Sequence, residues 1–99
     1  MSDYKRISIE QTQQLIDSKP VVLVDVRDAQ SYQAGHIDGA ISLDNSNIEQ
    51  FLQSTEKNAT IIVYCYHGNS SQQVAQYLCE QGYKDVSSMD RGFEDWRLK

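Results

Sequence analysis

Two short runs of nearly continuous apolar residues mark the centre of the predicted fold. VVLVDV covers residues 21–26 and TIIVYC covers residues 60–65. Both runs are rich in β-branched side chains, and such runs are typical of strands that are buried on both faces of a parallel sheet. We therefore predict two central strands, the second of which ends at Cys65.

Three segments have apolar residues at helical spacing, with polar residues between them. The predicted helices lie within residues 7–18, 45–54 and 70–83. Each has one apolar stripe, as expected of a helix on the surface of a domain. The third predicted helix has Ser70 or Ser71 as its N-cap and Gly82 as its C-terminal stop.

Weaker patterns supply the remaining elements. Short strands are expected within residues 5–8, 39–43 and 85–90. A last helix within residues 92–99 would turn Phe93 and Trp96 inward. The alternation of strands and helices predicts a three-layer α/β/α domain with a mostly parallel sheet.

Length and composition favour a single domain over residues 1–99. The chain has 99 residues, of which 39% are hydrophobic and 23% charged, enough for one core and too few for two. We find no repeat, low-complexity tract or Pro/Gly-rich linker in it.

The charge and the cysteines exclude several classes of function. A net charge of -5 would repel nucleic acids and acidic membranes. No apolar stretch is as long as the apolar core of a signal peptide or as the roughly 20 residues that span a bilayer. We therefore expect a cytoplasmic protein. Cys65 and Cys79 lack the C-x-x-C spacing of a redox motif or zinc site, and both are expected to be free thiols, Cys79 within the core.

Cys65 lies where a ligand site is expected. It ends a strand, and strand-to-helix loops gather at that edge of an α/β sheet. Gly68 and Asn69 tolerate positive φ, so the loop can turn its N–H groups inward beside the positive end of the next helix, which favours a thiolate. A tight connection with an incidental buried cysteine is the alternative from the loop alone. The predicted anion-binding residues are Tyr66, His67, Gly68, Asn69, Ser70 and Ser71.

Three motifs together resemble the single-domain rhodanese family. CYHGNSS, residues 65–71, is similar to its active-site loop, especially that of the short bacterial thiosulfate sulfurtransferases, and DRGFEDW, residues 90–96, is similar to its C-terminal signature. LVDVRDAQSYQAGHIDGAISL, residues 23–43, resembles its upstream signature. The upstream matches are Asp25, Arg27, Tyr32, Gly35, His36, Ile37, Gly39 and Ala40, and the C-terminal ones are Gly92, Phe93 and Trp96.

The resemblance implies a five-stranded parallel sheet with helices on both faces, and it implies sulfur transfer. The Cys65 thiolate would attack the outer sulfur of a donor such as thiosulfate, sulfite would leave, and a Cys65 persulfide would remain. Cyanide, or a dithiol such as reduced thioredoxin, would then accept that sulfur. This chemistry requires neither a metal nor an organic cofactor.

The chain departs from the family pattern in its charges. Rhodanese loops often contain Arg or Lys, whereas His67 is the only residue of this loop that can become cationic, so we expect weak capture of thiosulfate. Arg91 stands where the family usually has glycine. We predict that it leans toward the mouth of the site and partly replaces the loop cation, the alternative being a solvated side chain at a turn.

Four further residues are expected to support the site. Asp25 and Arg27 would form a structural ion pair beneath it. His36 would be a hydrogen-bonded turn residue with a modest electrostatic role. Trp96 would belong to the core and form one wall of the pocket.

Three other functions compete with sulfur transfer. Related phosphatases and arsenate reductases use C-x5-R, but the seventh position from Cys65 is Ser71 and carries no closing Arg. A cysteine hydrolase is disfavoured because His67 is only two residues from Cys65 on a curling loop. A non-catalytic binding or regulatory module is the third alternative, and the presence of Cys65 argues against it.

Overall fold

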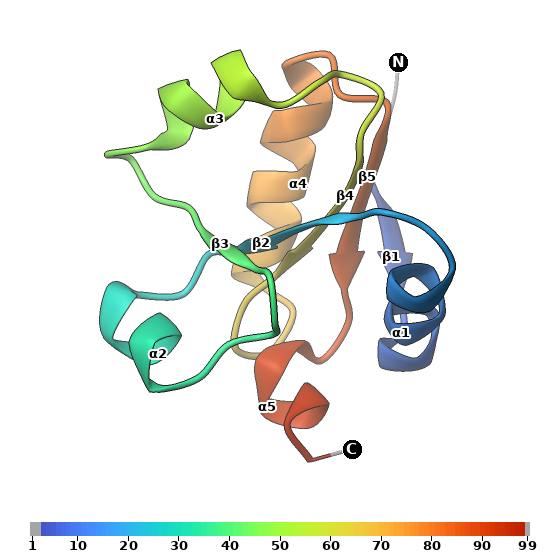
Figure 1. The fold of residues 1–99 in the computed structure, drawn as a ribbon, viewed down its shortest axis with the longest axis vertical. Coiled ribbons are helices and arrows are strands. Elements are labelled where there is room, and N and C mark those ends of the chain that lie inside the picture. The colour runs from blue at the N-terminus through green and yellow to red at the C-terminus, as the bar shows by residue number, and fades with distance from the viewer. Residues whose placement is uncertain (1–2, 99) are drawn as a thin grey trace.

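A computed structural model describes residues 3–98 and shows strands and helices in alternation (Figure 1). The strands are β1 (Lys5–Ile7), β2 (Val22–Asp25), β3 (Ile41–Ser42), β4 (Thr60–Tyr64) and β5 (Asp85–Met89). The helices are α1 (Ile9–Ser18), α2 (Ala29–Ala34), α3 (Ile48–Ser54), α4 (Ser70–Glu80) and α5 (Gly92–Trp96).

The five strands form one parallel sheet in the order β1-β5-β4-β2-β3. The predicted three-layer fold is confirmed, and so is the central place of the strand that precedes Cys65. In the register between β2 and β4, Asp25 lies opposite Tyr64. The ends of β2 and β4 therefore reach the same sheet edge together, and Cys65 follows one residue later.

β4 joins the two cores of the domain because its side chains alternate between the sheet faces. Ile61 and Val63 belong to the core that includes residues of α3 and α4. Ile62 and Tyr64 belong to the other core, against which residues of α1 and α5 pack. Helices accordingly cover both faces of the sheet (Figure 1).

Throughout residues 3–98, no helix is long and apolar enough to cross a membrane.

The predicted N-cap of α4 is wrong by one or two residues. Its N-cap is Asn69, which makes no side-chain capping bond, and not Ser70 or Ser71. Ser71 lies inside the first turn, where its N–H group and its hydroxyl both contact the sulfur of Cys65. The Cys65 sulfur therefore accepts the N–H hydrogen bond that the side chain of a serine N-cap would otherwise accept.

The C-terminal helix is shorter than predicted, since α5 ends at Trp96, and Lys99 lies outside the described residues. Phe93 and Trp96 pack against a core cluster, as the sequence predicts. Cys79 is also a core residue and a free thiol.

Helix α2 escaped the sequence analysis because it has no apolar stripe and no buried residue. It begins with a local signal nonetheless. Asp28 is its N-cap, and the Asp28 carboxylate accepts hydrogen bonds from the Ser31 backbone N–H at 3.1 Å and from the Ser31 hydroxyl at 2.9 Å. An aspartate is among the preferred residues at this position.

A buried ion pair joins the end of β2 to the loop that follows. The Arg27 guanidinium donates to Asp25 with Nη2 2.8 Å from Oδ2, and the two side chains are 3% and 0% exposed. The Arg27 backbone N–H also donates to Asp25, and Arg27 Nη2 donates to the Gly35 carbonyl at 2.6 Å. The predicted ion pair beneath the site is confirmed as a structural feature.

Removing one partner of this pair is expected to destabilise the fold strongly. Asp25→Ala leaves a buried guanidinium uncompensated and should lower the free energy of unfolding by about 3–5 kcal/mol. Arg6→Ala is the matched control, because its ion pair with Asp90 is exposed, and its cost should stay below about 1 kcal/mol. Urea denaturation of both variants measures the difference; equal losses would contradict the structural role of the buried pair.

Candidate active site

Cys65 sits at the bottom of a loop with its sulfur surrounded by hydrogen-bond donors. The residue is only 4% exposed. Its Sγ accepts from the backbone N–H groups of Gly68 at 3.2 Å and Ser71 at 3.3 Å. The Ser71 Oγ lies 3.4 Å from the same sulfur and 2.8 Å from the Ser88 Oγ. The sulfur thus takes the role of an N-cap acceptor at the first turn of α4.

These donors favour the thiolate form of Cys65. Burial alone would raise the pKa of the thiol, but hydrogen bonds from the Ser71 hydroxyl and from the N–H groups of Ser71, Gly68 and His67 outweigh it, so the pKa of Cys65 lies below its ordinary value. The pKa of Cys79, in contrast, is raised by burial and by nearby acidic groups. Only Cys65 therefore has the surroundings of a reactive cysteine.

The start of α5 fixes the direction of the peptide groups after Cys65. The Phe93 N–H donates to the Cys65 carbonyl at 2.8 Å, and the Glu94 N–H donates to the Tyr66 carbonyl at 3.1 Å. In a trans peptide the C=O and the following N–H point in opposite directions. Binding of these two carbonyls to α5 therefore turns the N–H groups of Tyr66 and His67 away from α5.

Glycine is required where the loop and α5 meet. Gly92 has φ +64°, and a Cβ on it would lie 2.4 Å from the carbonyl oxygens of both Cys65 and Tyr66. Gly68 has the positive φ predicted for it, +90°, and a Cβ there would lie 2.8 Å from the Arg91 nitrogen. The contact between loop and helix start is thus too close for any side chain at either glycine.

The buried ion pair supports this contact from below. The Arg27 guanidinium carbon lies 4.1 Å from the centre of the Phe93 ring and 5.7 Å from that of Tyr66. Each ring presents its negative face to a cation. Phe93 carries the N–H that binds the Cys65 carbonyl, and Tyr66 belongs to the loop itself, so Arg27 packs against both sides of this contact.

Hydrogen bonds of the Tyr66 side chain also hold the loop in place. The Tyr66 hydroxyl contacts both the Asp28 carboxylate and the Ser31 hydroxyl at the start of α2. The hydrogen bond from Tyr66 is the main cause that lowers the pKa of Asp28 to about 2. Asp28 thus joins α2 to the sulfur-binding loop while it caps that helix.

His67 and Arg91 line one groove, together with Arg6, Asp90 and Asp95. The Arg91 Nε lies 2.9 Å from the Asp95 Oδ2, and the Arg91 side chain is 75% exposed. The partner carboxylate offsets much of the charge that we expected near the mouth. A role of Arg91 or His67 in anion binding stays a prediction.

His36 and Trp96 are the other residues that were predicted to support the site. The His36 Nδ1 is 2.7 Å from the Tyr32 carbonyl, and the two rings stack with centres 3.8 Å apart. His36 is therefore hydrogen-bonded, but it lies between the C-cap of α2 and the turn at residues 38–39, and its electrostatic role stays a prediction. Trp96 packs against the core that contains Tyr64; its place as a pocket wall remains a prediction.

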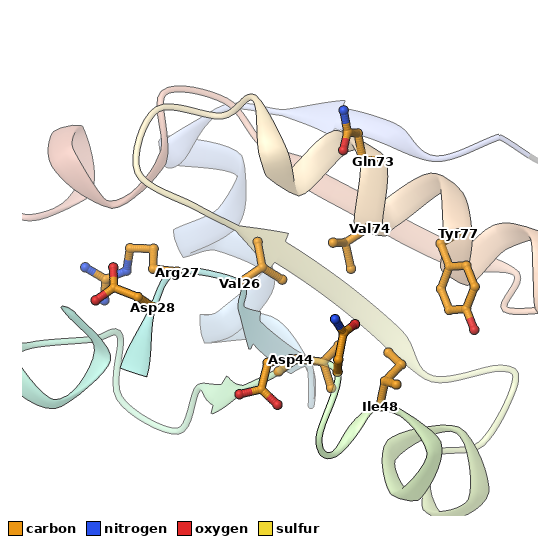
Figure 2. A pocket seen from close by; sticks show the side chains of 10 residues that line it. Val26, Arg27, Asp28, Asp44, Ile48, Gln73, Val74 and Tyr77 are labelled. Carbon is orange, nitrogen blue, oxygen red and sulfur yellow. The ribbon is translucent and has the colours of Figure 1, made fainter. Parts of the chain in front are cut away.

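An apolar groove runs beside the loop, between α4 and the segments that follow β2 and β3 (Figure 2). Val26, Ile48 and Val74 line it, with Tyr77 on α4. Figure 2 shows that the Arg27 side chain extends away from Val74 and Tyr77, which agrees with its burial against Asp25. Arg27 therefore lines the groove but directs its guanidinium to the ion pair with Asp25.

Several residues of the site were missed by the sequence analysis. Ser88 lies on a buried strand, and a serine in such a strand is the one local signal that could have marked it. Asp28 was missed together with α2, and its one local signal is that aspartate is a preferred N-cap residue. The close fit of Gly92 against the loop joins segments far apart in the chain, and no local pattern predicts it. No group of His, Cys, Asp and Glu in the described part of the chain is arranged to hold a metal ion.

Comparison with known proteins agrees with this geometry. The chain is 48% identical over 97% of its length to a protein of Shewanella oneidensis named thiosulfate sulfurtransferase GlpE, of which the match covers 95%. It is 54% identical over 94% of its length to the protein of that name from Pseudoalteromonas translucida, of which the match covers 89%.

A solved structure shows the same fold. The rhodanese-like domain protein from Staphylococcus aureus is 31% identical, with a TM-score of 0.80 over 93% of this chain and 90% of its own. The rhodanese-like domain family matches residues 8–99. This match covers most of the chain, and together with the relatives at about half identity it shows that the chain belongs to the rhodanese family.

Proposed function

We propose that this protein is a thiosulfate sulfurtransferase that carries sulfur as a persulfide on Cys65. The observation that carries the proposal is the set of contacts on the Cys65 sulfur, which accepts hydrogen bonds from the Gly68 and Ser71 N–H groups and lies 3.4 Å from the Ser71 hydroxyl. The relatives at about half identity that are named thiosulfate sulfurtransferase support the choice of donor.

In the first half-reaction the Cys65 thiolate attacks the outer sulfur of thiosulfate. A new S–S bond forms on the enzyme, the S–S bond of thiosulfate breaks, and sulfite leaves with the electron pair of that bond. The charge that develops on the sulfur atoms is held by preorganised N–H dipoles, which need no rearrangement during the step. Groups from Tyr66 to Ser71 supply these dipoles.

In the second half-reaction a nucleophile attacks the outer sulfur of the persulfide, and the Cys65 thiolate is restored. Cyanide would leave as thiocyanate. A dithiol such as reduced thioredoxin would take the sulfur on one thiol and release it as sulfide when its second thiol closes a disulfide. We place this reaction in a reducing compartment, the cytoplasm, because Cys65 must stay unoxidised between turnovers.

Two alternatives are weaker on specific grounds. In phosphatases of the C-x5-R type the seventh residue is an arginine that grips the phosphate, whereas Ser71 is buried here and its hydroxyl contacts Cys65 and Ser88. A non-catalytic module would have no need for a cysteine whose pKa is lowered by four hydrogen bonds.

We propose that residues 1–99 act as one catalytic domain.

Incubation with thiosulfate should add the mass of one sulfur atom to the protein, and cyanide should remove it. Cys65→Ser should abolish the adduct, while Cys79→Ser, the matched control at the second cysteine, should retain it. Intact-mass spectrometry measures both. An adduct on Cys65→Ser, or none on the unaltered protein with thiosulfate, would reject the proposal.

The alkylation rate of Cys65 should follow its lowered pKa. Because the thiolate is the reacting form, the rate should be high above the pKa of the folded protein and fall as the pH drops through it. We expect the midpoint to lie below that of the denatured chain, and Ser71→Ala to move it upward, because the Ser71 hydroxyl is the largest cause that lowers this pKa. Iodoacetamide labelling across pH measures the midpoint; an unchanged midpoint in Ser71→Ala would contradict the assignment.

Gly92→Ala should displace the Cys65 and Tyr66 carbonyls and with them the peptide N–H groups of Tyr66 and His67, of which the His67 N–H helps to lower the pKa of Cys65. We expect persulfide formation to slow by about 100-fold, as when a donor to a developing anion is lost. Gly39→Ala is the matched control, because Gly39 also has positive φ, +84°, but no atom lies within 4 Å of a Cβ placed there. Equal rates in the two variants would show that the tight contact is irrelevant to catalysis.

A further inference from the structure

A third outward carbonyl of the loop is bound by a side chain. The Gln72 Nε2 donates to the Gly68 carbonyl at 2.7 Å, in addition to the two bonds from α5. The Gly68 N–H meanwhile donates to the Cys65 sulfur. Since C=O and the following N–H of a trans peptide are opposed, the bond to Gln72 turns the N–H of Asn69 away from Gln72.

The peptide between Gly68 and Asn69 can rotate more easily than the other peptides of the loop. Glycine populates positive and negative φ about equally well, so rotation of the peptides on either side of Gly68 is cheap. A flip of the Gly68–Asn69 peptide would exchange an N–H for a carbonyl oxygen and reverse the local dipole. That carbonyl oxygen would lie in the loop between Gly68 and Ser71, the two residues whose N–H groups contact the sulfur, and its partial negative charge would disfavour an anionic sulfur.

The amide of Gln72 is itself oriented by Tyr4. The Tyr4 hydroxyl donates to the Gln72 Oε1 at 2.9 Å, across 68 residues of sequence. An amide presents an acceptor at one end and donors at the other, and the two ends have nearly the same shape. With Oε1 bound to Tyr4, the Nε2 end is the one left to meet the Gly68 carbonyl. Tyr4 itself packs against the core that contains residues of α4.

We propose that Gln72, oriented by Tyr4, is a positioning residue that holds the Gly68–Asn69 peptide in the direction that favours negative charge on the Cys65 sulfur. The inference rests on the proposed sulfur transfer and adds to it a residue outside the loop. Gln72 does not touch the reacting sulfur. It acts on the rate through the peptide, and on the pKa of Cys65 in the free protein.

The test compares two glutamine variants in the same turn of α4. Gln72→Glu keeps the size of the side chain but replaces the donor with a carboxylate that repels the Gly68 carbonyl. Gln73→Glu adds the same charge one residue later, on an exposed side chain. We expect persulfide formation from thiosulfate to be about 10-fold slower in Gln72→Glu than in Gln73→Glu. The decrease in kcat should be larger than any increase in KM, and the two variants should have similar melting temperatures.

Tyr4→Phe provides a second variant that leaves Gln72 in place. It removes only the hydroxyl that orients the amide and should slow the reaction by a smaller factor, about 3-fold. Equal kcat in Gln72→Glu and Gln73→Glu, or a loss in Gln72→Glu that a lowered melting temperature fully explains, would overturn the proposal.

A readout independent of thiosulfate separates this inference from the proposed function. The midpoint of Cys65 alkylation with iodoacetamide should move to higher pH in Gln72→Glu than in Gln73→Glu. If the protein forms no persulfide but this difference is present, the positioning role stands and the proposed reaction falls. If the persulfide forms and the two midpoints coincide, the positioning role of Gln72 is rejected.

Discussion

The direction of the peptide groups that follow Cys65 is the constraint on which the site depends. Three carbonyls in this segment, those of Cys65, Tyr66 and Gly68, are bound by donors outside the loop. The opposed N–H groups, those of Tyr66, His67 and Asn69, are turned away from these donors, and the His67 N–H is among the hydrogen bonds that lower the pKa of Cys65. In the proposed reaction the charge on the sulfur is held by backbone N–H groups, and donors elsewhere in the fold keep those peptide groups in place.

Those donors come from parts of the chain that are far apart in sequence. Two belong to the start of α5, whose Phe93 ring rests on the Arg27 guanidinium. Another is Gln72, oriented by Tyr4 ahead of β1. The Asp25–Arg27 pair is costly to bury and is satisfied by several hydrogen bonds. The pair lies against the Phe93 ring at the start of α5, next to the N–H that binds the Cys65 carbonyl.

The sequence predicts the framework well because the framework depends on local patterns. Continuous apolar runs marked β2 and β4, and the stripe of α4 was clear. The position of Cys65 at the edge of the sheet and the positive φ of Gly68 also followed from local rules. The N-cap of α4 did not, because the acceptor there is a sulfur five residues before the helix. Helix α2 was missed because it buries no apolar face, and the roles of Gly92, Gln72 and Ser88 arise from contacts between distant segments.

Backbone control of the charge on sulfur can be observed directly in the amide resonances of the loop. In a ¹H–¹⁵N NMR titration of the free protein, the amide protons of Gly68 and Ser71, which contact the sulfur, should shift with a common midpoint as Cys65 ionises. The same amides should shift again when the persulfide forms, and Cys65→Ser should abolish both changes. Amide shifts that ignore the state of Cys65, or that persist in Cys65→Ser, would show that the loop does not hold the sulfur charge.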